Sequence, residues 1–124
     1  MAAKRIFVSY DYTKERSLKN AFVTQAKEQG LQIRDFSLEE DHRDPQWEEK
    51  AKLQIRQCNL VVVLIGEDTH DSDGIRKEVA IANGFQIPII QIRNKRARTE
   101  NYGKTKGAGK EYPWKWTVLN PLLR

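Results

Sequence analysis

The residue with the clearest chemical potential in this sequence is Glu78, which lies between Lys77 and Val79 in a segment with helical spacing of apolar residues. If Ile75 and Val79 face inward, Glu78 stands at the border of the apolar stripe and can reach over the end of a strand. A carboxylate there could stabilise the positive charge that develops on a sugar ring when a glycosidic bond breaks. The alternative is a solvated acid that is favoured by the N-terminal dipole of its helix.

A small set of polar and aromatic residues follows the apolar runs of the sequence. In an open parallel sheet, ligands bind beyond the carboxyl ends of the strands, at the point where the strand order reverses. The residues that would meet there are Ser9, Tyr10, Asp11, Ser37, Leu38, Gly66 and His70. Trp47, at the start of a helical segment, is a second aromatic neighbour of this cluster. Packing in the core is the alternative role of Trp47 and Tyr10, and capping of the strand end is that of Ser9.

The elements that must position these residues alternate between short apolar runs and helical periodicity. Residues 60–65 (LVVVLI) show no polar alternation, which is typical of a strand buried on both faces of a parallel sheet. We expect further strands at residues 5–10, 31–36 and 87–92. We expect helices from the Thr13 cap to Gly30, from the Asp44-Pro45 start through Ile55, from Ile75 to Gly84, and at residues 112–116.

This alternation predicts an α/β fold with a parallel sheet and right-handed crossovers. About four strands fit a flavodoxin-like three-layer sandwich with the strand order 2-1-3-4. The 124 residues suffice for one compact domain, and neither an internal repeat nor a linker divides them. We therefore expect a single domain that spans residues 1–124.

The net charge of +5 is concentrated in one segment. Residues 93–110 hold seven basic side chains against Glu100 alone, whereas residues 1–92 are slightly acidic. A solvated loop is the expectation for this basic segment, and nucleic-acid binding through it is a weaker hypothesis. Cys58 is the one cysteine, and the chain has neither an apolar run of membrane-spanning length nor the apolar stretch of a signal peptide. We expect a cytoplasmic protein without a membrane partner.

Several familiar chemistries lack their residues. The sequence Ser9-Tyr10-Asp11-Tyr12 is neither a flavodoxin phosphate loop nor a dinucleotide glycine fingerprint. No phosphorylatable aspartate ends the third strand, and the glycine-rich residues 103–110 lack the spacing of a P-loop. His70 and Cys58 have no metal-ligand spacing, so we expect no metal.

Seven motifs in order resemble the bacterial TIR-like family, which includes the NAD-consuming TIR proteins of the Thoeris anti-phage system. They extend over almost the whole chain, from about Lys4 to Leu119. The motifs are FVSYDY (7–12), LKNAF (18–22), DFSLEE (35–40), WEEKA (47–51), LIGEDTH (64–70), GIRKE (74–78) and YPWKW (112–116). The fold that this resemblance implies is flavodoxin-like, in agreement with the periodicity.

The resemblance implies cleavage of the nicotinamide–ribose bond of NAD+, with a cyclic ADP-ribose isomer or a related product as a signal. Glu78 matches the position of the family's catalytic glutamate. Ser37 and Leu38 match the loop that closes over the substrate, and Trp47 would pack against a ring of the ligand. Ser9, Tyr10, Asp11, Gly66 and His70 would line the site.

The implied partners follow from the same resemblance. NAD+ is the substrate and no cofactor is expected. A separate effector would read the product, a phage-derived trigger would activate the protein, and the chain would form a homo-oligomer. Asp71 and Asp73 depart from this pattern, because two acids before the helix of Glu78 would repel a pyrophosphate unless nearby cations compensate. A non-catalytic TIR-like adaptor or a nucleotide-sensing module is the alternative function.

Overall fold

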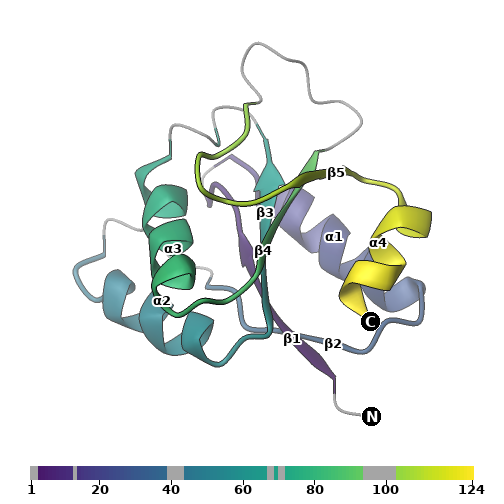
Figure 1. The fold of residues 1–124 in the computed structure, drawn as a ribbon, viewed down its shortest axis with the longest axis horizontal. Coiled ribbons are helices and arrows are strands. Elements are labelled where there is room, and N and C mark those ends of the chain that lie inside the picture. Colours follow the sequence, from purple (N-terminus) through teal and green to yellow (C-terminus); the bar gives the residue numbers. More distant parts are fainter. Residues whose placement is uncertain (1–2, 13, 39–43, 67–68, 70–71, 94–102) are drawn as a thin grey trace.

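The computed structural model describes residues 3–124 except 13, 39–43, 67–68, 70–71 and 94–102. Strands and helices alternate along most of the chain, so the predicted α/β class is confirmed (Figure 1). The elements are β1 (Lys4–Ser9), α1 (Arg16–Glu28), β2 (Ile33–Asp35), α2 (Trp47–Arg56), β3 (Leu60–Ile65), α3 (Asp73–Gly84), β4 (Ile89–Arg93), β5 (Glu111–Pro113) and α4 (Trp116–Leu123).

The sheet is parallel throughout and has the order β2-β1-β3-β4-β5. The order 2-1-3-4 is confirmed for the first four strands, and β3 lies in the middle with all six of its residues buried. The sheet has one strand more than we expected. The added strand, β5, comprises three residues, one of them proline, and such a short edge segment has no period-2 pattern that a sequence could show.

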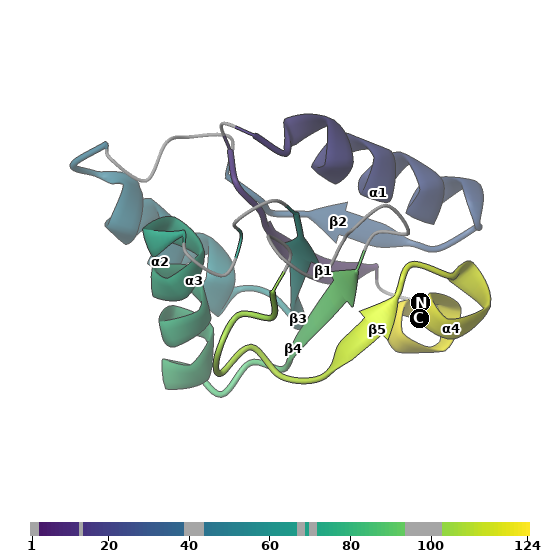
Figure 2. The ribbon, with the colours of Figure 1, turned by 90° about the horizontal axis from the view of Figure 1, so that it is seen from above.

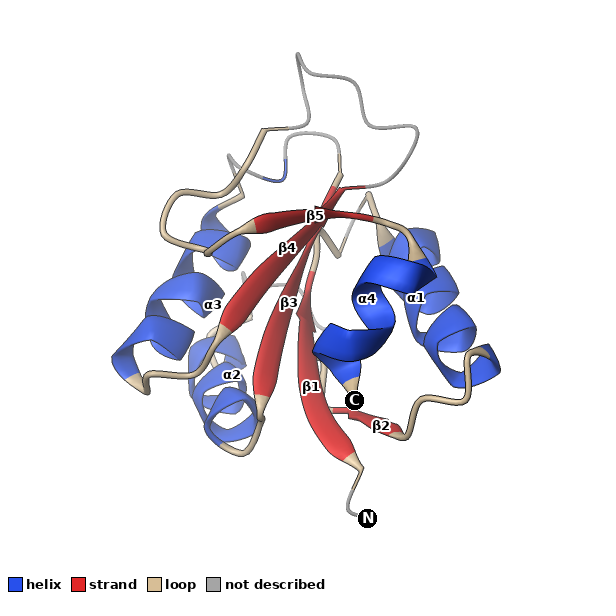
Figure 3. Cartoon of the chain, turned by 45° about the vertical axis from the view of Figure 1, so that its right-hand side comes forward, coloured by secondary structure: helices blue, strands red, loops and turns tan. Residues whose placement is uncertain are grey.

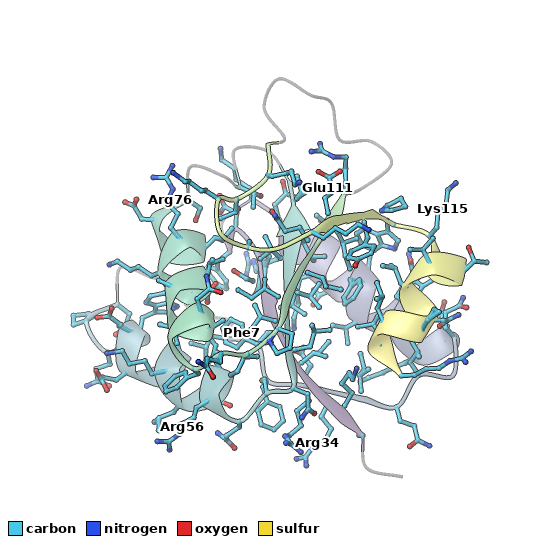
Figure 4. All side chains as sticks on the ribbon, in the orientation of Figure 1. Phe7, Arg34, Arg56, Arg76, Glu111 and Lys115 are labelled. Atoms are coloured by element: carbon cyan, nitrogen blue, oxygen red, sulfur yellow. The ribbon has the colours of Figure 1, made fainter. Side chains whose placement is uncertain are left out.

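Each face of the sheet has its own layer of helices (Figure 2). Alternate residues of β1 point to opposite faces, so Val8 packs with α1 and α4, and Phe7 packs with α2 and α3. Phe7 is fully buried in the interior, as Figure 4 shows. The first layer contributes Phe22 and Leu119, among others, to the core. The result is the predicted three-layer sandwich.

The C-terminal segment differs from the expected helix at residues 112–116. Tyr112 and Pro113 belong to β5, and α4 begins only at Trp116. Trp114 and Trp116 both donate from Nε1 to Gln25 Oε1 at 2.9 Å. Both indoles also pack on Phe22, one edge-on and one stacked. The two indoles therefore dock against α1, and Figure 3 shows α4, which begins at Trp116, on the same side of the sheet as α1.

Two other element boundaries lie beyond those expected. Asp44 was expected to cap the second helix, but α2 begins at Trp47. Asp44 instead forms a turn before it, because its Oδ1 accepts from Gln46 N and its carbonyl accepts from Trp47 N. β4 begins at Ile89, after Pro88, which has no amide hydrogen to give to a ladder. The predicted Thr13 cap lies outside the described residues.

The basic segment is a loop that is anchored to the core where the structure describes it. Across residues 103–110, Thr105 and Ala108 are buried and the three lysines are exposed. Gln91 of β4 holds this segment: its Nε2 donates to the carbonyls of Thr105 and Gly109, and its Oε1 accepts from Thr105 N at 2.8 Å. Ala108 then packs against Val63 and the helix α3. The expected loop is present with its lysines exposed, but its anchoring was not expected, because the buried amide of Gln91 in an internal strand leaves no local pattern.

None of the helices in the described ranges has both the length and the apolar character needed to cross a membrane.

We predict that Gln91→Ala lowers the free energy of unfolding by about 1–3 kcal/mol, because it leaves two carbonyls and one buried amide hydrogen of the 103–110 segment without this partner. Urea denaturation measures the change. Gln32→Ala, at an exposed position before β2, is the matched control and should change stability by less than about 0.5 kcal/mol. Equal effects of the two substitutions would contradict the anchoring role of Gln91.

Candidate active site

The site lies where the connections from the sheet diverge. The chain leaves β1 toward α1 on one face, and it leaves β3 toward α3 on the other face. The strands β1 and β3 are neighbours, with Ser9 opposite Val63. Open parallel sheets bind their ligands at the carboxyl ends of such strands, between connections that diverge to opposite faces. Ser9 ends β1 and Gly66 directly follows β3 at this edge.

Glu78 belongs to the buried face of α3 and not to its border. Its side chain is 6% exposed, in a helix that turns Ile75, Val79 and Ala82 inward as predicted. Ser72 sets the start of this helix, because its hydroxyl accepts from Ile75 N. The alternative of a solvated acid is therefore wrong. Ile75, Val79 and Ala82 are core residues, and the helical period places Glu78 on the same inward side of α3.

Ser9 is the partner of Glu78. Its hydroxyl donates to Glu78 Oε1 at 2.7 Å, across 69 residues of sequence, and Ser9 has no exposed surface. Ser9 lies opposite Val63 in a parallel pair, so both side chains point to the α3 face of the sheet. The strand register thus places a hydroxyl directly beneath the third helix.

Burial raises the pKa of Glu78 from 4.5 to about 8, although the Ser9 hydrogen bond acts in the opposite direction. Removal from water disfavours the charged carboxylate more than one hydroxyl donor can compensate. The carboxyl is therefore mostly protonated at neutral pH in the unliganded protein. A cation placed beside it would favour the carboxylate form and would release its proton.

Tyr10, Ser37 and Leu38 lie near the end of β1, and two hydrogen bonds tie β1 to the segment after β2. Ser37 Oγ accepts from Val8 N at 2.7 Å, so a hydroxyl extends the β1–β2 pairing beyond Asp35. The Tyr10 hydroxyl donates to the Leu38 carbonyl at 3.3 Å. These contacts bring the three predicted residues together at one edge, and their contact with a substrate stays a prediction.

The remaining predicted site residues have varied surroundings. Trp47 is 3% exposed and packs with Phe7 and Ala51 in the core, and Asp11 accepts from Lys14 N in the turn before α1. Gly66 N donates to the buried Thr69 hydroxyl at 2.8 Å. His70 lies outside the described residues. Roles in substrate binding for these four stay predictions.

A pocket of about 200 Å³ opens beside the predicted loop residues. It is lined by Asp35, Phe36, Ser37, Leu38 and Gln54. Its volume is below the roughly 300–1,000 Å³ of typical ligand sites, so it has room for one part of a ligand only.

The structure brings two residues to the site that the sequence did not single out. Lys19 is almost fully buried and pairs with Asp35 at 2.6 Å, and although burial of Asp35 opposes ionisation, Lys19 and Ser37 hold its pKa below the usual value. Glu15 lies against Gly66 at the end of β3. A buried lysine leaves no mark in the sequence, whereas a glutamate at a helix start was a visible but ambiguous signal.

Metal and thiol chemistry have no support among the described residues. They contain no group of three or more His, Cys, Asp or Glu side chains that could hold a metal ion. Cys58 is buried, and burial raises the pKa of its thiol to about 12, so the reactive thiolate is scarce at neutral pH.

The sequence profile of the family described as "Thoeris protein ThsB, TIR-like domain" matches residues 7–99. The matched range contains Ser9, Gly66 and Glu78. No curated protein matches the chain in sequence.

Two solved structures share the fold. The CMP N-glycosidase BcmB of Clostridium botulinum aligns with a TM-score of 0.58 at 19% identity, over 96% of this chain and 98% of its own. A 3-dehydroquinate dehydratase-like protein from Bifidobacterium longum aligns with a TM-score of 0.51 at 14% identity, over 98% of this chain and 93% of its own. Both likenesses concern the fold, and they agree with the predicted three-layer architecture.

We predict that the stability difference between the wild type and Glu78→Gln depends on pH. In the unfolded chain Glu78 ionises near pH 4.5, whereas in the folded protein it stays protonated until about pH 8. Between these values the unfolded state binds fewer protons, so the wild type loses stability relative to Glu78→Gln as the pH rises through this window. Above about pH 8 the difference is constant.

Urea unfolding at pH 5, 6, 7 and 8 measures this difference. Glu28→Gln, at the exposed end of α1, is the control and should give a difference without this dependence. A difference for Glu78→Gln that stays constant from pH 5 to 8 would show that the carboxyl is already ionised in the folded protein.

Proposed function

The chain belongs to the family of Thoeris ThsB TIR-like domains, a defence-related family, and from this membership and its site we propose that it cleaves the nicotinamide–ribose bond of NAD+. The product is an ADP-ribose derivative, such as a cyclic ADP-ribose isomer, that acts as a signal in anti-phage defence. The observation that carries the proposal is the buried pair of Glu78 and Ser9 at the carboxyl edge of the sheet.

The reaction needs a group that stabilises a positive charge as it develops on the ribose. When the bond from C1′ to the pyridinium nitrogen breaks, its electron pair goes to the nitrogen and nicotinamide leaves as a neutral molecule. The ribose is left as an oxocarbenium-like cation. Water captures this cation in hydrolysis, or a nucleophilic atom of the ADP-ribose captures it in cyclisation, with release of a proton in the case of water or a hydroxyl.

Glu78 suits the role of the group that stabilises this cation. Its carboxyl is desolvated, so its interaction with a developing charge is weakly screened. The proton that it holds at neutral pH must leave before the carboxylate can act, and the cationic substrate favours that loss. Ser9 positions the carboxyl through Oε1 and leaves the other oxygen for the ribose.

A second candidate reaction has a specific observation in its favour. The CMP N-glycosidase BcmB shares the fold over nearly the full length of both chains. Cleavage of a nucleotide's N-glycosidic bond passes through the same kind of oxocarbenium-like transition state as cleavage of NAD+. CMP is therefore the comparison substrate in the test below.

We predict that the protein releases nicotinamide from NAD+ and that Glu78→Gln lowers kcat by about 100-fold or more, because an amide cannot offer a negative charge to the ribosyl cation. Purified protein is incubated with NAD+ or CMP, with and without lysate of phage-infected cells, and mass spectrometry identifies the products. Lys77→Gln, the exposed neighbour on α3, is the control. Cytosine release in place of nicotinamide would support the second candidate, and turnover of neither substrate would favour a non-catalytic adaptor or sensor.

We predict that Ser9→Ala shifts the pH profile of kcat/KM to higher pH. The rate should rise with pH toward about 8 in the wild type, because the carboxylate is the active form. Without the Ser9 hydroxyl the lowering effect of its hydrogen bond is lost, so the midpoint of the rise moves upward. A reduced rate with an unmoved midpoint would mean that Ser9 has only a packing role.

A further inference from the structure

Glu15 has an unusual position for its residue type. It is the N-cap residue of α1, where a short side chain normally accepts a hydrogen bond from the first turn of the helix. Its carboxyl makes no such hydrogen bond, and the side chain is half-buried. Asp11 and Glu15 are joined by the backbone, because Glu15 N donates to the Asp11 carbonyl at 2.7 Å. The turn after β1 therefore presents the carboxyl of Glu15 toward the neighbouring strand.

The carboxyl of Glu15 lies against the backbone of Gly66. A Cβ atom placed on Gly66 would fall 2.5 Å from both Cδ and Oε1 of Glu15. Real Cβ atoms do not approach other atoms this closely, so the position of Glu15 requires that residue 66 carries no side chain. The glycine after β3 thus makes room for an acid that comes from the other layer of the molecule.

Glu15 and Glu78 flank the same edge of the sheet from opposite layers. Glu78 reaches Ser9 from α3, and Glu15 reaches Gly66 from the start of α1; Figure 2 shows these helices on opposite sides of the sheet. Ser9 is level with Val63, and Gly66 lies three residues further along, which corresponds to about 10 Å of strand. The two contact points are therefore separated by a length comparable with that of a nucleoside.

We propose that Glu15 is a specificity-determining residue that selects a cationic leaving group. The inference rests on the proposed function, in which the ribose lies at Glu78. A nucleoside along this edge would then place its base toward Glu15. The ring of NAD+ carries a positive charge before the bond breaks, and a carboxylate beside it stabilises the bound substrate.

The two acids would act at different stages of the reaction. Before bond cleavage the positive charge is on the ring, near Glu15. In the transition state this charge moves to the ribose, near Glu78. Glu15 therefore lowers KM and kcat together by stabilising the bound substrate, whereas Glu78 raises kcat by stabilising the transition state. After cleavage nicotinamide is neutral, so Glu15 no longer holds it.

The test compares NAD+ with nicotinic acid adenine dinucleotide, whose ring carries an additional carboxylate. Glu15→Gln should raise both the KM and the kcat for NAD+ about five- to tenfold and leave kcat/KM within about twofold, because it removes a stabilisation of the bound substrate that is lost in the transition state. It should lower the KM for the nicotinic acid analogue, because a repulsion is removed. Glu28→Gln, at the exposed end of the same helix, is the matched control and should change neither value.

Gly66→Ala provides an independent route to the same change. The backbone of Gly66 lies outside the left-handed region, so alanine adds only its Cβ, and this atom displaces the carboxyl of Glu15. It should reproduce the KM changes of Glu15→Gln, and the double variant should show no additional change. Thermal unfolding of each variant verifies that the fold is intact.

The outcomes separate this proposal from the proposed function. If the wild type cleaves NAD+ and Glu15→Gln leaves both KM values unchanged, or changes only kcat, the role of Glu15 is refuted and the cleavage reaction stands. If the wild type cleaves neither dinucleotide, the proposed function fails. Calorimetric binding of the two dinucleotides to Glu78→Gln and to Glu15→Gln/Glu78→Gln then decides on Glu15. If the ratio of the affinities for NAD+ and the nicotinic acid analogue is the same in both variants, or if neither dinucleotide binds, the role of Glu15 is overturned.

Discussion

The burial of one carboxyl group, that of Glu78, is the constraint on which the rest of this site depends. Water would stabilise its charged form far better than the apolar layer between β1 and α3 does, and a single hydroxyl, from Ser9, partly compensates. An apolar residue would suit the same place better if stability were all that mattered. A loss of stability from a buried carboxyl is typical of functional sites, where chemistry and not packing decides which residue is present.

Three separate features of the fold maintain this buried state. The parallel register of β1 and β3 brings Ser9 under α3, and the Ser72 cap sets the phase of that helix. The third feature is the segment of residues 103–110, which packs on the same face of the sheet as α3. Gln91 holds this segment, and Ala108 packs beside Val63 and Ile75. The three lysines of the segment stay at the surface, where they contribute to the net charge of +5.

The edge of the sheet thus combines an inner acid with an outer one. Glu78 is desolvated and burial raises its pKa, whereas Glu15 is half-buried at the end of β3. In Figure 4, Arg76 lies at the N-terminal end of α3, on the surface beside this edge. This part of the surface therefore carries charged groups of both signs, and the proposed substrate, NAD+, contains both a cationic ring and an anionic pyrophosphate.

The sequence by itself determined the fold class, the first four strands in their order, and Glu78 as the residue of interest. The fold class and the strand order rest on local periodicity, since the run of residues 60–65 is typical of an inner strand. Glu78 was singled out by its place beside Ile75 and Val79 and by the resemblance to the TIR-like family. Only the tertiary structure decided that Glu78 is buried, that Ser9 is its partner and that Glu15 shares its edge. The physical reason is that the burial and the pKa of a side chain depend on neighbours far away in the chain, here 69 residues apart. The strand β5 was missed for a different reason, because three residues are too few to show a period.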